Sequence, residues 1–158
     1  MIRYLIHKLK VRACARRFSL FANIAEGTHG DGNITKKVDA VQALRHALVK
    51  FGSDADHVAV TTADTEIPLG ICDDEAATIE DNINVQVLGQ KPGTILGRAH
   101  AAIDAGDLLV PAAAGRVQTI DGLSSVTTYV IGIALNAATT QDDLVEIAHC
   151  VPVQRVIA

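Results

Sequence analysis

The chain has 158 residues, a length typical of one domain that folds without disulfides or metal ions. Hydrophobic residues make up 49% of it, but aromatic residues make up 3% and Trp is absent, so the core must be built from small aliphatic side chains. The chain carries 14 basic and 18 acidic residues, and six of the basic ones precede residue 18. The remainder is therefore acidic and poor in stacking side chains, which argues against nucleic acid as a partner.

No apolar run reaches the roughly 18 residues that a membrane span needs, so we expect no membrane partner and a soluble, intracellular protein. Three cysteines, Cys14, Cys72 and Cys150, show no metal-binding spacing. Buried free thiols are the favoured interpretation, and a disulfide between Cys72 and Cys150 is the alternative. We expect no metal and no cofactor.

The first segment, Met1 to Phe21, alternates apolar and basic residues. Four interpretations remain open: an amphipathic surface-binding helix, a targeting peptide, a basic arm that binds a shell or nucleic acid, or an extension outside the fold. The sharp change of composition near Ser19 favours the last, so we assign residues 1–18 to a basic extension.

Residues 19–37 are rich in Gly, Asn, Asp and Thr, which predicts a flexible arm. Neither glycine-rich phosphate-binding pattern occurs there. Residues 38–158 are predicted to form a single β domain. Its first stretch, Val38 to Phe51, fits either an amphipathic helix or a turn that leads into a strand at His46.

Short runs rich in Val, Ile and Thr, each bounded by turn residues, predict strands along the rest of the chain. The predicted strands are His57–Thr61, Ile67–Cys72, Asn84–Leu88, Thr94–Ala99, Leu108–Val110, Val117–Ile120, Tyr129–Leu135, Leu144–Ala148 and Val151–Ala158. The fold class is all-β, a small barrel or sandwich of short strands.

Four of these runs recur about sixty residues later in the same order. The predicted matches are Leu48-Val49 with Leu108-Leu109, Val58 to Val60 with Val117 to Thr119, Leu69 to Ile71 with Ile131 to Ile133, and Asn84 to Val87 with Leu144 to Ile147. We therefore expect two similar halves of one barrel or sandwich.

Few residues suggest chemistry. Asp54, Asp56 and His57 could form a metal site or an acid and base pair, although an exposed turn before a strand explains them as well. The five acids between Asp73 and Asp81 lack calcium-binding loop spacing, and Asp142-Asp143 at the equivalent point fits a turn. No catalytic serine or cysteine motif occurs, so the prediction is a protein that is not an enzyme.

Several turn and strand motifs resemble those of the small capsid decoration proteins, or cement proteins, of tailed bacteriophages and prophages. The motifs are Ala25 to His29, Gly52 to Val60, Ile67 to Ile71 followed by Asp74 to Ala76, Ala105 to Leu108, and Gly132 to Leu135. The resemblance covers Leu20 to Ala158, whereas the basic segment Met1 to Arg17 departs from the pattern of the family.

The resemblance implies a compact β-rich protein, often a homotrimer, that binds the major capsid protein on the outer surface of the virion and stabilises contacts between capsid subunits. In lambda-type members an N-terminal arm adds a strand to the capsid. Expected capsid contacts are therefore in the Gly-rich segment: Ala25, Glu26, Gly27, Thr28, His29, Gly30, Asp31, Gly32 and Asn33. Before assembly the protein would be in the cytoplasm of the bacterial host.

Two other functions remain open. A small-molecule or metal-binding barrel, or an enzyme, would use the turn of Asp54, Asp56 and His57. An adaptor for membranes or nucleic acid would use Met1 to Arg17 and would bind in a salt-sensitive manner.

Overall fold

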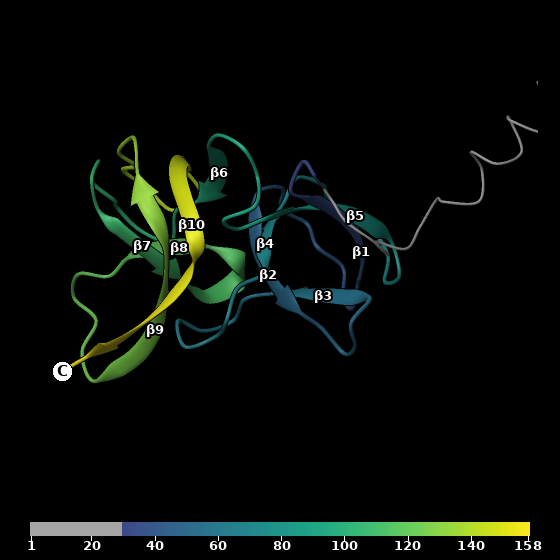
Figure 1. Ribbon diagram of the computed structural model, residues 1–158, viewed down its shortest axis with the longest axis horizontal. Helices are drawn as coiled ribbons and strands as arrows, with labels where there is room; N and C mark the ends of the chain where they lie inside the picture. Colours follow the sequence, from purple (N-terminus) through teal and green to yellow (C-terminus); the bar gives the residue numbers. More distant parts are fainter. Residues whose placement is uncertain (1–29) are drawn as a thin grey trace, which may run out of the picture.

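The computed structural model of the protein describes residues 30–158, and these form an all-β structure, as predicted. Figure 1 shows two bodies side by side, which we call the first unit (residues 33–88) and the second unit (residues 95–157). The strands of the first unit are β1 (Asn33–Val38), β2 (Ala47–Phe51), β3 (His57–Val60), β4 (Gly70–Cys72) and β5 (Asn82–Val87). Those of the second are β6 (Ile95–Arg98), β7 (Leu108–Pro111), β8 (Val117–Thr119), β9 (Val126–Ala134) and β10 (Leu144–Ile157), with a short 3-10 turn at Ala113–Gly115.

The first unit is a closed barrel with strand order β1-β3-β2-β4-β5. Its neighbouring strands pair antiparallel except for β1 and β3, which run parallel, with Val38 opposite Val58. Side chains that alternate along the strands point inward and form a core of aliphatic residues. The members of this core are Val38, Ala47, Val49, Val58, Cys72, Ala76, Ile83 and Val85.

The second unit is a five-stranded sheet of order β6-β10-β9-β7-β8. With β6 to β10 as the counterparts of β1 to β5, this is the cyclic order of the closed barrel, read from β1 in the opposite direction. Its edge strands β6 and β8 are joined within the described chain by one parallel bridge, between Ala99 and Val117. That bridge corresponds to the parallel pairing of β1 with β3 in the first unit. The second unit is therefore the same barrel left almost open.

The hydrogen bonds confirm that the two halves repeat. His46 N–H donates to the Cys72 carbonyl at 2.8 Å, and Gly106 N–H donates to the Ala134 carbonyl at 2.8 Å. Antiparallel bridges link Gln42 with Ala76 and, in the second unit, Ile103 with Ala138. Three of the four predicted matches agree with this register.

The fourth match was wrong by two residues. Gly70 pairs with Val87, and its counterpart Gly132 pairs with His149, so Asn84 corresponds to Glu146 and not to Leu144. A shift by two leaves the alternation of inward and outward side chains unchanged, so the hydrophobic pattern cannot detect it.

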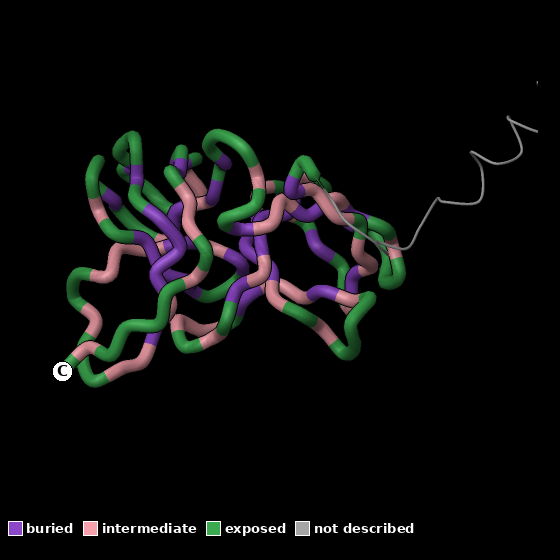
Figure 2. The backbone as a smooth tube through the Cα atoms, in the orientation of Figure 1, coloured by how far each residue is buried: buried purple, intermediate pink, exposed green. Residues whose placement is uncertain are grey.

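The first unit closes the open side of the second. Leu48 and Ile71 point out of the first barrel, yet both are fully buried and belong to the core cluster of the second unit, together with Leu88. The remaining members of this cluster are Ile95, Ala99, Ile103, Leu109, Val117, Ile131, Ala134, Ala138, Val145 and Ile147. Figure 2 shows the buried stretches running through the junction between the two bodies. The core of the second unit is thus shared between the two units, whereas the interior of the first barrel forms a separate cluster.

Several boundaries differ from the predictions. Strand β1 begins at Asn33, so the last residues of the expected arm form part of the barrel. The helical alternative for Val38 to Phe51 is wrong, because β1 ends at Val38 and β2 begins at Ala47. The two predicted C-terminal strands are one strand, β10, with a register shift between His149 and Val153.

Cys72 and Cys150 are free thiols, so the disulfide alternative is wrong. Cys72 lies buried inside the first barrel, where burial raises its pKa, and Cys150 is half-buried on β10. Within residues 30–158 we find no helix of the length and apolarity that would cross a bilayer.

Candidate functional site

The expected capsid-contact segment lies partly outside the described residues. Ala25, Glu26, Gly27, Thr28 and His29 fall in residues 1–29, of which the structure describes nothing. Gly30 and Asp31 are exposed in a turn that precedes β1. The Asp31 carboxylate accepts hydrogen bonds from the side chain of Asn33 at 3.1 Å and from its backbone N–H at 3.2 Å, and these bonds lower the pKa of Asp31.

Gly32 and Asn33 are fixed to the barrel. The Gly32 carbonyl accepts a hydrogen bond from Val87 N–H at 2.8 Å, and the Asn33 side chain accepts one from Lys91 Nζ at 3.0 Å. Gly32 is buried at φ +70° against the backbone of Lys91, where a Cβ atom would clash. Any capsid contact through these two residues would therefore involve the rim of the barrel.

Two carboxylates, one from the turn between β2 and β3 and one from the loop before β5, lie beside His57. Its Nδ1 lies 2.6 Å from Asp54 Oδ1, and its Nε2 lies 3.0 Å from Glu80 Oε1. Glu80 also accepts a hydrogen bond from Lys37 Nζ at 2.9 Å, and Asp56 N–H donates to Asp54 at 2.8 Å. Both ring nitrogens are therefore occupied within the cluster, and neither faces an open site.

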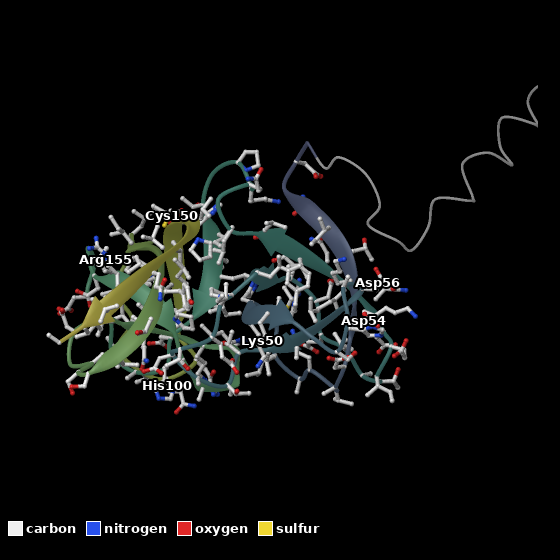
Figure 3. All side chains as sticks on the ribbon, turned by 60° about the horizontal axis from the view of Figure 1, so that its bottom comes forward. Lys50, Asp54, Asp56, His100, Cys150 and Arg155 are labelled. Carbon is white, nitrogen blue, oxygen red and sulfur yellow. The ribbon has the colours of Figure 1, made fainter. Side chains whose placement is uncertain are left out.

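The charges of this cluster support one another. The hydrogen bond to Asp54 raises the pKa of His57 despite partial burial, and the contact with Glu80 raises it further. The pKa of Asp54 is lowered by His57, and that of Glu80 is lowered by Lys37 and then by His57. Figure 3 places Asp54 and Asp56 at the end of the barrel far from Cys150 and Arg155.

The second unit has an equivalent ion pair. Arg116 corresponds to His57, and its Nε donates to Asp142 Oδ1 at 2.9 Å, while Arg98 Nη1 donates to the Asp142 carbonyl at 3.2 Å. The pKa of Asp142 is lowered by the Arg116 hydrogen bond. Because the same contact recurs with a different cation, we assign the His57 cluster a structural role in fixing the turn onto the sheet.

Carboxylates of the two acidic loops accept hydrogen bonds from backbone N–H groups of the same loop. Asp81 Oδ2 accepts from Thr78 N–H at 2.8 Å, and its counterpart Asp143 Oδ2 accepts from Thr140 N–H at 2.9 Å. These bonds lower the pKa of both carboxyls. No cluster of three or more His, Cys, Asp or Glu side chains within residues 30–158 is arranged to hold a metal ion.

One concave surface lies elsewhere, between the first barrel and the irregular middle of β10. This groove of about 580 Å³ is mostly apolar, with Phe51, Ile67 and Val151 on its exposed rim and Leu88 at its base. Its charged lining residue, Lys50, forms an ion pair with Glu66. The sequence did not reveal the groove, because its two sides come from segments about 60 to 100 residues apart that meet only in the folded state.

No protein-family model matches the chain, and no curated protein matches it at a significant level. Among solved structures it is similar to one described as the crystal structure of head fiber gp8.5 N base in bacteriophage phi29. The two are 23% identical with a TM-score of 0.49, over 76% of this chain and 94% of that chain.

Proposed function

We propose that this protein is a structural component of a phage-like virion that binds the outer surface of the capsid and stabilises contacts between major capsid subunits. It acts without catalysis, and several copies, three by the resemblance, associate with one another on the lattice. The proposal rests first on the motifs that resemble those of capsid decoration proteins, two of which lie on turns and strands of the described fold. Gly52 to Val60 forms a turn and β3, and Gly132 to Leu135 lies at the end of β9.

The observation that carries the proposal is the nature of the exposed surfaces. The polar atoms of the turn considered for catalysis, at Asp54 and His57, are bonded within their own cluster. Aliphatic side chains, in contrast, are exposed on the groove rim and on the outer face of the second unit. Exposed apolar surface of this kind is typical of protein contacts. A rigid body that engages a repeated lattice in many copies gains avidity even when each contact is weak.

Co-sedimentation with empty shells of the major capsid protein from the same genome tests this function. We expect saturable binding at one copy per capsid subunit and shells that resist heat better when coated. Absence of binding by the folded protein would overturn the proposal.

The contribution of the N-terminal segment is tested by removing residues 1–29. This cut leaves β1 intact, unlike a cut before Thr35, which would remove Asn33 and Ile34 from the barrel. We expect the truncated protein to fold and to lose shell binding. Full binding after truncation would show that the capsid contacts lie in residues 30–158.

A further inference from the structure

The outer face of the second unit is apolar where that of the first is polar. Leu108 pairs with Ile133 across β7 and β9, and Ile133 pairs with Ala148 on β10. In the next row Leu96 pairs with Glu146, whose carbonyl accepts the Leu135 N–H at 2.8 Å. The five aliphatic side chains of this face are between 38% and 48% exposed: Leu96, Leu108, Ile133, Leu135 and Leu144.

The corresponding positions of the first unit separate into two groups. Thr35, Asp73 and Asn82 correspond to Leu96, Leu135 and Leu144, and these polar residues are exposed or half-buried. Leu48 and Ile71 correspond to Leu108 and Ile133, and both are fully buried under the second unit. The outer face of the first unit is therefore apolar where the second unit covers it. Where this face is exposed to solvent, it is polar.

Two charged side chains lie beside the aliphatic residues of the face: Glu146, which pairs with Leu96, and Arg98, which pairs with Leu144. Glu146 Oε1 accepts a hydrogen bond from Thr94 Oγ1 at 2.6 Å, so one of its acceptor sites is already satisfied within the sheet. Arg98 donates to the Arg45 carbonyl at 2.7 Å and to the Asp142 carbonyl at 3.2 Å, so its guanidinium is also engaged within the chain. The remaining large side chains of the face are aliphatic. A face with this composition and about five large side chains resembles the core of a protein interface.

The structure also indicates what covers such a face. Leu48 and Ile71 are covered by the second unit, which repeats the fold of the first. Both side chains pack into the core of that unit. In another copy of the chain the open side of the second unit is already filled by that copy's own Leu48 and Ile71. A second copy therefore has its exposed apolar surfaces available: this same face, or the groove rimmed by Phe51 and Val151.

We infer that one copy of the chain binds another through the outer face of the second unit. This face is formed by Leu96, Leu108, Ile133, Leu135 and Leu144. The inference deepens the self-association included in the proposed function and rests on it. It assigns to the second unit the contact between copies, and leaves the groove and the N-terminal segment for the capsid.

Sedimentation velocity of the full chain tests this surface, with a variant that transfers the polar residues of the first unit onto it: Leu96→Thr, Leu135→Asp and Leu144→Asn. We expect the wild type to form dimers or trimers at micromolar concentration and the variant to dissociate about 100-fold more readily. Thr35→Asp, at the position of the first unit that matches Leu96, is the control and leaves the assembly intact. If the triple variant fails to fold, as judged by circular dichroism, Leu96→Thr alone gives the same test with a smaller effect.

A wild type that stays monomeric up to roughly 100 μM, or a folded variant that assembles as well as the wild type, would overturn the inference. Shell co-sedimentation of the same variant separates this failure from failure of the proposed function. A monomeric variant that still binds shells supports both. If the wild type is monomeric and the variant loses shell binding, the face belongs to the capsid contact, and the self-association inference falls while the proposed function stands.

Discussion

The first unit is a closed barrel with a polar outer face, and the second is a nearly open one with an apolar outer face, although their strands follow the same order. The barrel closes where β1 lies parallel to β3 through two residue pairs, whereas the second unit keeps a single bridge at Ala99. The comparison shows that the same strand arrangement can enclose its core in two ways. Its own edge strands can pair with each other, or side chains of a neighbouring unit can cover the open side.

The largest effect should come from truncating Ile71, a side chain of the first unit that packs into the core of the second. Ile71→Ala should lower the free energy of unfolding by about 2–5 kcal/mol, because it opens a cavity in the shared core. The equivalent change on the exposed face, Ile133→Ala, should cost less than about 1 kcal/mol in dilute solution. Urea unfolding measures both, and equal losses would contradict the difference between the units.

Glycine positions should show where the two units are alike. A Cβ at Gly70 would meet the Gln86 carbonyl, and one at Gly132 would meet the Ala148 carbonyl, so each requires close approach of two strands. We expect Gly70→Ala and Gly132→Ala each to destabilise the protein by roughly 1–3 kcal/mol. Gly30→Ala is the control, since nothing lies within 4 Å of its added carbon. A loss at one position alone, measured by thermal unfolding, would show that the repeat does not extend to packing.

The Lys50–Glu66 ion pair distinguishes the first unit, since Val110 takes the place of Lys50 in the second. Burial would raise the pKa of Glu66, but hydrogen bonds from Lys50 and Thr62 outweigh it and lower the pKa to about 2. A lowered pKa contributes stability that is complete above the ordinary glutamate range near 4.5 and is lost as the pH falls towards 2.

Glu66→Gln should therefore flatten the loss of stability between pH 4.5 and pH 2, measured as the urea midpoint at each pH. Glu75→Gln, at an exposed acid of the neighbouring loop, is the control. An unchanged acid slope in Glu66→Gln would show that this pair does not contribute to folding.

The smallest effect concerns the two equivalent cations, His57 and Arg116. Because the folded pKa of His57 is raised, mainly by Asp54, its stabilising charge is present below the ordinary histidine pKa near 6.5 and is lost as the pH rises through the folded value. His57→Arg should remove this dependence, because arginine stays charged.

The reciprocal change, Arg116→His, should introduce the same dependence in the second unit. Urea midpoints at pH 5.5 and pH 8.5 compare the three proteins. The expected order of pH sensitivity is Arg116→His first, wild type second and His57→Arg last. The reverse order would mean that the two clusters are not equivalent.

The sequence predicts most strands and the repeat, because alternating aliphatic residues between turn residues leave a clear pattern in β2 to β9. It misses β1, whose residues Thr35, Lys36 and Lys37 are polar. Lys36 nonetheless packs its stem on the barrel, with 11% of its side chain exposed, and its Nζ donates to the Ala55 carbonyl at 2.6 Å. A strand that contributes little apolar surface cannot be recognised from hydrophobic periodicity.

For the candidate site, the sequence points to Asp54 and His57 but not to Glu80, which lies in the loop after β4. That contact depends on the pairing of β1 with both β3 and β5, which no local pattern encodes. The same holds for the apolar face of the second unit. Leu96, Ile133 and Leu144 look like core residues in the sequence, and only the register shows that they point outward.

The closed barrel also has a consequence for the order in which the chain matures on the ribosome. Residues 33–88 contain a complete core and leave the ribosome before β6 to β10, so they can fold while the rest is being synthesised. The second unit cannot complete its core without Leu48 and Ile71, which the finished barrel already presents. During synthesis from the N-terminus, the first barrel can therefore form before the sheet of the second unit, which packs against it.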